Sequence, residues 1–208
     1  MRIFFLIVVT VAMSLVPCEL PGQREGWALE VDEDGVVVYV RPEAGSDMSV
    51  KVSTVARTTV AEVQRVLDDA AAYPEWVHRC AGAYVIPGGA PNDYVYYSHI
   101  DLPFPFQDKE VVARIQQYVL SETGVLVRNI TAEPDALPPP KGRDRLLAYD
   151  ARWTVTPLPQ GTVEITCQVR TSAGSGLPMW LRTEILTGGP AQTVKNLRRR
   201  LETAAVGK

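Results

Sequence analysis

Histidine and cysteine are scarce in this chain, which has two histidines and three cysteines among its 208 residues. A zinc site needs several His or Cys ligands that converge at short spacings. His78 and Cys80 lie close together in the sequence, but no second pair of such ligands accompanies them. We therefore expect no metal site.

The usual signatures of nucleophilic catalysis and of cofactor binding are also absent. A nucleophile needs an oriented base, and only His78 and His99 offer an imidazole. Gly174-Ser175-Gly176 lacks the strand before it and the helix after it that a nucleophile elbow requires. Gly88-Gly89 stands alone between prolines, so there is neither a phosphate loop nor a dinucleotide fingerprint. We expect no cofactor, and a binding protein is favoured over an enzyme.

An excess of basic charge is absent too, since 21 Lys and Arg stand against 24 Asp and Glu, a formal net charge of −3. Nucleic-acid binders normally carry a basic stripe that neutralises phosphates. The only dense basic run, Arg198-Arg199-Arg200, falls at the end of a predicted helix, where cations suit the helix dipole. We therefore expect no nucleic-acid partner. The 46% of hydrophobic residues suits one globular domain, expected to be monomeric, with a core large enough to hold an internal cavity.

The longest apolar run, residues 3–16, is too short to span a bilayer comfortably as a helix. Arg2 precedes it, which is typical of an export signal. We predict a signal peptide over residues 1–22 and an exported protein, periplasmic or secreted. Three fates stay open: cleavage near Gly22, lipidation of Cys18 within a stretch that looks like a bacterial lipobox, and an uncleaved N-terminal anchor.

The mature chain, residues 23–208, is expected to form one domain. Its two cysteines, Cys80 and Cys167, could form a disulfide in an oxidising compartment, and two buried free thiols are equally compatible with the sequence.

Alternation of apolar and polar residues dominates after Gly26 and predicts strands. The predicted strands cover residues 27–31, 36–41, 50–57, 84–87, 94–101, 110–120, 125–132, 146–156 and 162–171. Gly35 is expected to supply a positive φ in the first hairpin turn. A helix is predicted over residues 60–72, and a long helix over residues 178–205, divided at Gly188-Gly189-Pro190. This order predicts an α+β fold in which the last helix lies across a curved, mainly antiparallel sheet.

The alternation also predicts which residues face inward. Over residues 145–155, Leu147, Tyr149 and Trp153 share one apolar face, and Arg145 falls on the same face. A charge that faces a core is costly unless it has a partner. Arg145 therefore implies either an ion pair or a polar ligand head group. The candidate acidic partners lie around one proline-rich corner: Asp101, Asp108 and Glu110.

Two further inward rows contain Ile115 and Ile165, and the tyrosines at 94, 96 and 97 add rings with hydroxyl groups. Such rows suit the wall of a ligand pocket, and they suit a plain core as well.

The first half of the last helix is apolar over a wide arc that includes Met179 and Ile185. A helix that covers a pocket has this pattern. Glycines at 174, 176, 188 and 189 flank the segment, and glycine permits large backbone rotations. We hypothesise that this segment is a lid that opens.

Five short pieces in a fixed order carry a family resemblance. They are Trp27-Ala28-Leu29 with Asp34-Gly35-Val36; Tyr73-Pro74-Glu75-Trp76; Leu102-Pro103-Phe104-Pro105-Phe106 with Asp108-Lys109-Glu110; Arg145 before Trp153; and Gly176-Leu177-Pro178-Met179-Trp180-Leu181. From about residue 27 to residue 201 the chain resembles the START family, the steroidogenic-acute-regulatory-related lipid-transfer domains, in particular its bacterial members.

The resemblance implies a helix-grip fold, in which a curved antiparallel sheet grips a long C-terminal helix around a hydrophobic tunnel for one lipid or sterol. It also implies that Arg145 occupies the family's charged cavity position and that residues 178–186 form the lid. The chain departs from the family where Lys109-Glu110 replaces a frequent Arg-Asp and Phe104 replaces a frequent Trp. These departures concern the identity of the ligand more than the fold.

The first hypothesis is a non-enzymatic carrier of one hydrophobic molecule, with transient membrane contact during transfer. The candidate ligand-binding residues are Trp76, Tyr96, Tyr97, Asp101, Ile115, Arg145, Tyr149, Trp153, Ile165, Met179 and Ile185. The alternative is a cyclase or aromatase-type enzyme of the same superfamily that uses His99 or Asp101. A third alternative is an interaction module filled by its own side chains, which would leave no cavity of even about 300 Å³, the low end for ligand pockets.

Overall fold

The computed structural model describes residues 26–43, 48–138, 141–171 and 177–206. The predicted signal peptide over residues 1–22, with Cys18, lies outside these residues, as do Gly174 and Gly176 of the predicted lid. None of the helices within the four described ranges has both the length and the hydropathy needed to cross a bilayer.

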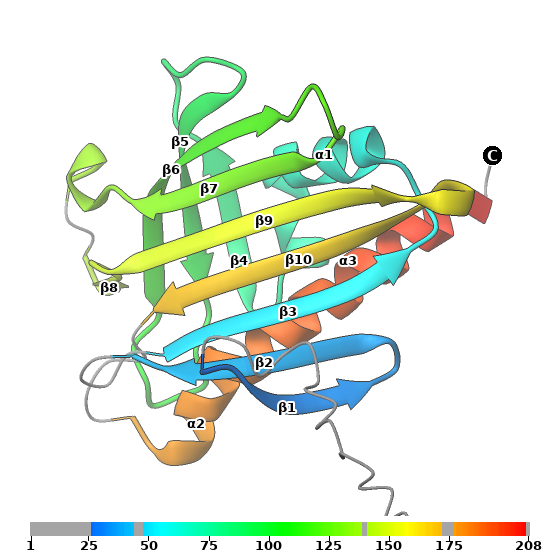
Figure 1. Cartoon of the computed structure of the whole chain (residues 1–208). Coiled ribbons are helices and arrows are strands. Elements are labelled where there is room, and N and C mark those ends of the chain that lie inside the picture. The colour runs from blue at the N-terminus through cyan, green and yellow to red at the C-terminus, as the bar shows by residue number, and fades with distance from the viewer. Residues whose placement is uncertain (1–25, 44–47, 139–140, 172–176, 207–208) are drawn as a thin grey trace, which may run out of the picture.

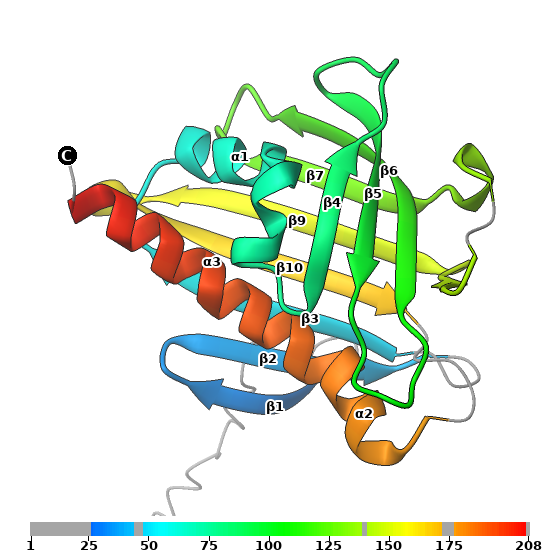
Figure 2. The ribbon, with the colours of Figure 1, turned by 180° about the vertical axis from the view of Figure 1, so that it is seen from behind.

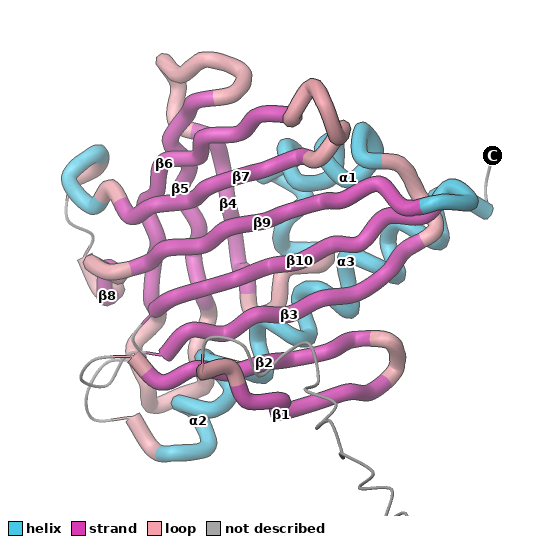
Figure 3. Tube along the Cα trace, viewed as in Figure 1, coloured by secondary structure: helices cyan, strands magenta, loops and turns pink. Residues whose placement is uncertain are grey.

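The described residues form one strongly curved sheet (Figures 1 and 3). Its strands are β1 (Ala28–Glu33), β2 (Val36–Pro42), β3 (Met48–Ala56), β4 (Cys80–Val85), β5 (Asp93–Ile100), β6 (Lys109–Val119), β7 (Leu126–Ala132), β8 (Asp144–Arg145), β9 (Tyr149–Leu158) and β10 (Thr162–Thr171). The order across the sheet is β1-β2-β3-β10-β9-β7-β6-β5-β4, and the neighbours are antiparallel. The short β8 pairs in parallel with β6. The predicted α+β class and antiparallel sheet are confirmed.

The first hairpin turns at Asp34 and Gly35, whose φ angles are +53° and +70°. Two consecutive positive φ angles are those of a type I′ turn, which matches the twist of the strands on either side. The predicted positive φ at Gly35 is confirmed. A Cβ at this position would lie 2.7 Å from a terminal nitrogen of Arg198, so the end of that flexible side chain would have to move.

The predicted helix over residues 60–72 is shorter than expected. Helix α1 (Val60–Asp68) is capped by Thr59, whose hydroxyl accepts a hydrogen bond from the Glu62 N–H at 3.2 Å. The α-helix ends where Asp69 leaves the helical conformation, with φ −84° and ψ 73°, and the chain continues as a 3₁₀ helix over Ala70–Glu75. The hydroxyl of Tyr73 donates to the carbonyl of Leu67 at 2.6 Å and so satisfies one carbonyl at the end of α1.

The C-terminal helical segment lies across the concave face of the sheet (Figure 2). It consists of α2 (Met179–Thr183), a π-helical turn (Glu184–Gly188) and α3 (Gly189–Val206). The sequence predicted a break at Gly188-Gly189-Pro190, and the structure has a wider turn there. The Gly189 N–H reaches back five residues to the Glu184 carbonyl, and a Cβ at Gly189 would lie 3.2 Å from that oxygen.

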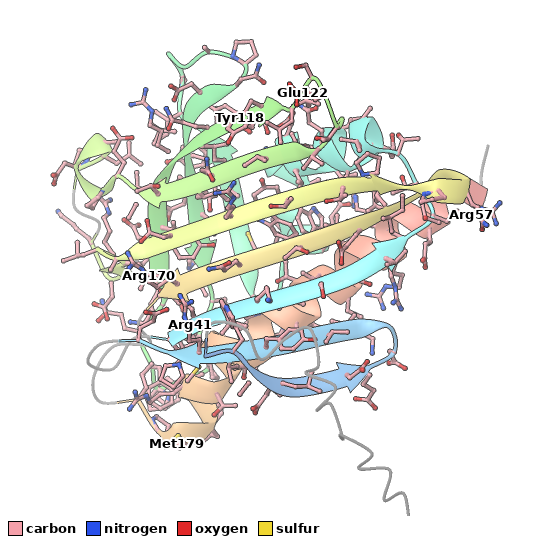
Figure 4. All side chains as sticks on the ribbon, viewed as in Figure 1. Arg41, Arg57, Tyr118, Glu122, Arg170 and Met179 are labelled. Atoms are coloured by element: carbon pink, nitrogen blue, oxygen red, sulfur yellow. The ribbon has the colours of Figure 1, made fainter. Side chains whose placement is uncertain are left out.

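The apolar stripe of α3 closes the core. Val194, Leu197 and Leu201 are fully buried against the sheet, and α3 packs mainly on β3. The opposite face of the sheet is polar, with Arg41 and Arg170 on the side away from α3 (Figure 4). The concave face under α3 is therefore where apolar side chains gather.

Candidate functional site

Inward-facing residues of neighbouring strands lie in register beneath the C-terminal helix. In one row Cys167 of β10 pairs with Trp153 of β9, which in turn pairs with Arg128 of β7. A parallel row contains Thr171 and Tyr149. All five side chains line one cavity. The alternation of strand residues thus builds a wall that is apolar except for a few polar groups at fixed positions.

The roof of the cavity comes from the C-terminal segment. Ile185 of the π-helical turn and Gly189, Pro190 and Thr193 of α3 complete the lining, and residues 76–80 close one side. The cavity has a volume of about 180 Å³. This is below the roughly 300 Å³ at which ligand pockets begin, as the alternative of an interaction module filled by its own side chains predicts. A drug-sized or larger ligand therefore requires the walls to move apart.

Arg128 stands at the inner end of the cavity and is almost completely buried, at 1% exposed. Its Nη1 donates to Asp68 Oδ1 at 2.6 Å and to Gln117 Oε1 at 2.8 Å. Its Nη2 donates to the hydroxyl oxygens of Tyr94 at 2.9 Å and Tyr73 at 3.2 Å. Burial raises the pKa of Tyr94 to about 12 and also raises the pKa of Tyr73. The arginine is therefore neutralised by one carboxylate and surrounded by neutral hydroxyl groups.

Three further polar groups of the wall are held in their neutral forms by burial. The pKa values of the Tyr96 and Tyr149 hydroxyls lie well above their ordinary values, and burial is the main cause for both. Burial likewise raises the pKa of the Cys167 thiol. Cys167 and Cys80 are both free, buried thiols, so of the two alternatives left open by the sequence the structure has the free thiols.

Glu184 of the π-helical turn fastens the roof to the side wall. Its Oε1 lies 2.7 Å from Nε2 of His78 and 3.5 Å from Nε of Arg79. The backbone N–H of His78 also donates to the hydroxyl of Thr193 at 3.1 Å. The wall and the roof are thus joined by an ion pair and two hydrogen bonds, which must break if the roof is to lift.

Comparisons with known proteins identify the fold of this chain. The chain is 31% identical over 175 residues to the uncharacterized protein PA1579 of Pseudomonas aeruginosa, which covers 84% of this chain and 86% of that protein. The crystal structure of a STAR-related lipid transfer protein from Xanthomonas axonopodis matches with a TM-score of 0.77 and 27% identity, over 85% of this chain and 99% of that one. The chain has the START fold.

More distant START structures share the fold alone. Human StAR-related lipid transfer protein 5 matches with a TM-score of 0.72 at 16% identity, over 88% of this chain and 89% of that one. No family model matches the chain. The helix-grip fold inferred from the five short sequence pieces is confirmed.

The START cavity brings together five of the eleven predicted ligand-binding residues. They are Trp76, Tyr96, Tyr149, Trp153 and Ile185. The strand residues among them reach the cavity because they occupy alternate, inward positions of β5 and β9. Trp76 follows the 3₁₀ helix, and Ile185 lies in the π-helical turn.

Arg145, which the resemblance placed at the charged cavity position, does not line the cavity. It lies in β8, where its Nε donates to Glu110 Oε1 at 2.6 Å. Its Nη1 donates to the carbonyl oxygens of Pro134 and Leu137. The alternation predicted over residues 145–155 does not extend to Arg145, because β9 begins only at Tyr149. Arg145 therefore forms a buried ion pair with Glu110, one of the three acidic candidates, and anchors the loop that contains Pro134 and Leu137.

Two predicted residues lie in the apolar core and not in the cavity wall. Ile115 and Ile165 are almost fully buried, and neither lines the cavity. Ile165 pairs with Val155 and Thr54, near the end of the sheet at which β9 turns into β10. The predicted inward direction of Ile115 and Ile165 is correct, but the cavity occupies only part of the concave face of the sheet.

The three remaining predicted residues point away from the cavity. Tyr97 follows the inward Tyr96 and therefore faces outward, where it stacks on Tyr84 with the ring centroids 4.9 Å apart. Asp101 is exposed just beyond the end of β5. Met179 is 75% exposed on α2 (Figure 4).

Arg128 is the most deeply buried charged residue of the cavity and is not among the residues predicted from the sequence. It occupies the inward position between Leu126 and Ile130 of β7, so the alternation argument applied to Arg145 would have found it. The same strand carries the neighbouring buried Val127, which blurs the alternation. Two arginines, Arg79 and Arg128, therefore line the cavity, and Arg128 is the fully buried one.

The histidines differ in their relation to the cavity. His99 lies outside the cavity, and its Nε2 is hydrogen-bonded to Oδ2 of Asp108 at 2.8 Å. His78 lines the cavity and contacts Glu184. Within the described ranges no three His, Cys, Asp or Glu side chains gather as a metal site would require.

Proposed function

We propose that this START domain is a non-enzymatic carrier that takes one hydrophobic molecule into the cavity beneath its C-terminal helix. The observation that carries this proposal is the cavity itself, which lies between the sheet and the helix and is lined largely by aromatic and aliphatic side chains. Removal of apolar surface from water would supply the affinity, at roughly 25 cal/mol per Å². The lipid-transfer name of the Xanthomonas relative agrees with this function.

The proposed lid is α2 together with the π-helical turn. Its opening would enlarge the cavity, which at about 180 Å³ is small for a lipid. The contacts of Glu184 with His78 and Arg79 hold it closed. π-Helical turns are often found at functional sites, because their wider backbone is locally less stable. The turn at Gly188 and Gly189 is therefore the proposed hinge.

The proposed membrane contact lies where the β5–β6 loop meets α2 (Figure 2). The two segments touch through Phe106 and Trp180, whose ring centroids are 6.3 Å apart. Phe104 is 97% exposed, and Met179 and Trp180 are 75% and 57% exposed. Contiguous exposed apolar side chains of this kind mark interaction surfaces. Because they adjoin the lid, contact with a bilayer would place the opening next to the lipid.

The enzyme alternative receives no support from the positions of its residues, since His99 and Asp101 lie outside the cavity lining.

We further propose that the protein is exported, on the strength of Arg2 and the apolar run that follows it. A carrier outside the cytoplasm would shuttle its ligand between membranes or hold it in the periplasm.

The test is a thermal-shift measurement on delipidated protein with lipids, sterols and quinones. We expect at least one class to raise the melting temperature, because a ligand bound only by the folded state stabilises it. Val169→Phe, which fills the cavity from β10, is the matched control and should abolish the shift. An unchanged melting temperature with every class would contradict the proposal.

A further inference from the structure

The charges around the cavity are balanced within the protein. Arg128 is paired with Asp68 at 2.6 Å, and Arg79 is paired with Glu184. The hydroxyls of Tyr96 and Tyr149 stay protonated, because burial raises their pKa values. No described cation or carboxylate of the lining is left over to neutralise a charged ligand group. Bringing such a group into the cavity would bury an unpaired charge, which is costly.

Most polar side chains of the wall also have their hydrogen bonds satisfied within the protein. Thr171 donates to the Ala148 carbonyl, and the Thr193 hydroxyl accepts from the His78 N–H. Ser98 lies 3.6 Å from the Cys80 thiol. These side chains therefore do not need a hydrogen bond from a ligand.

Trp76 is different. It lines the cavity and is 3% exposed, and its indole Nε1 is buried with no hydrogen-bond partner among the described residues. A buried N–H without a partner is unusual and costly. Arg79 Nε is the other buried nitrogen of the lining without a hydrogen bond, although it lies 3.5 Å from Glu184. Both groups are donors, so what the wall lacks is an acceptor.

We infer that the ligand is an uncharged hydrophobe whose polar end carries an oxygen acceptor, such as a ketone, ester or quinone carbonyl, and that Trp76 Nε1 donates a hydrogen bond to it. This inference rests on the proposed carrier function and narrows its substrate class. We expect fatty-acid anions and quaternary ammonium lipids to bind more weakly, since Arg128, Arg79 and Glu184 are already paired with groups of opposite charge.

The test uses four probes with similar chains: decane, methyl octyl ketone, decanoate and decyltrimethylammonium. Their dissociation constants are measured at neutral pH by displacement of the uncharged dye Nile red. We expect the ketone to bind at least tenfold more tightly than decanoate and the ammonium probe. Equal binding of decanoate or of the ammonium probe would overturn the charge argument.

Trp76→Phe removes the N–H and keeps an aromatic ring. In this variant we expect the affinity for the ketone, relative to that for decane, to fall about fivefold to tenfold, the effect of losing one buried hydrogen bond. The comparison with decane cancels the packing change and shows that the variant is folded. Trp27→Phe, at a buried tryptophan outside the cavity that packs against Arg41 and Lys51, should leave the ratio unchanged. An unchanged ratio in Trp76→Phe would overturn the assignment of the donor, whereas failure of all four probes to bind the wild type would contradict the carrier function itself.

Discussion

Arg128 Nη1 and Asp68 Oδ1, 2.6 Å apart, join β7 to the last residue of α1 at the inner end of the cavity. The arginine is buried, whereas the carboxylate reaches toward the surface. Asp68 Oδ1 also accepts hydrogen bonds from Tyr94 and Gln117. One pair of side chains thus holds the helix on the sheet and keeps a charge inside an otherwise apolar wall.

Arg128→Met is expected to destabilise the fold by about 3–5 kcal/mol, since removing one member of a buried ion pair leaves its partners unsatisfied. Urea unfolding followed by circular dichroism measures this. Arg114→Met is the matched control, because Arg114 pairs with Asp93 at the exposed surface, and it should leave the midpoint nearly unchanged. Equal effects of the two substitutions would show that the Arg128 network does not stabilise the fold.

Glu184→Gln is expected to speed ligand release about fivefold. The neutral amide cannot form the ion pair with Arg79, and charge-assisted hydrogen bonds are roughly twice as strong as neutral ones. Stopped-flow measurement of Nile red release gives the rate. Glu202→Gln, on the exposed side of α3, is the control. A release rate unchanged by Glu184→Gln would mean that this contact does not hold the lid.

Replacing Phe104 or Trp180 by Ser is expected to weaken binding to zwitterionic phosphatidylcholine vesicles, which carry no net charge, about tenfold each. Burying one large apolar side chain contributes roughly 1.5–3 kcal/mol. Sedimentation with vesicles measures the bound fraction. Tyr118→Ser removes an equally exposed aromatic ring from β6 (Figure 4) and should have no effect. If all three variants bind alike, the surface at α2 is not the membrane contact.

The β5–β6 loop should loosen in acid. The Leu102 N–H and His99 hold the pKa of Asp108 below its ordinary value of 3.8. A carboxylate whose pKa is depressed by folding stabilises the protein above its unfolded pKa and loses this effect as the pH falls toward the folded pKa. Asp108→Asn should therefore lower the melting temperature at neutral pH, and the difference from wild type should shrink below about pH 4.

The exposed Asp101 provides the control, since Asp101→Asn alters an exposed side chain just beyond β5 and should change the melting temperature little. A difference between wild type and Asp108→Asn that stays constant from neutral pH to pH values well below about 4 would contradict the role of Asp108.

Much of the fold followed from the sequence because strand alternation and turn residues are local signals. The positive φ of Gly35 and the inward row that contains Ile165 both depend on neighbours in the chain. The limits of β9 were less certain. The alternation of residues 145–155 looked continuous, yet Leu147 is exposed because the chain leaves the sheet before Tyr149.

The site was only partly predictable because inward direction does not say where a cavity lies. Ile115 and Tyr96 both face inward, but only Tyr96 lies where the C-terminal segment leaves space. That space depends on contacts between distant segments, such as His78 with Glu184. The partner of Arg128 is likewise sixty positions away in the chain, and no local pattern identifies it.

The most direct test of the carrier function is native mass spectrometry of the protein purified from its own compartment. We expect one hydrophobic, uncharged molecule bound to each chain, and we expect Val169→Phe, which fills the cavity, to lose it. A wild-type protein that carries no such molecule and acquires none when mixed with membrane extract would contradict the carrier function.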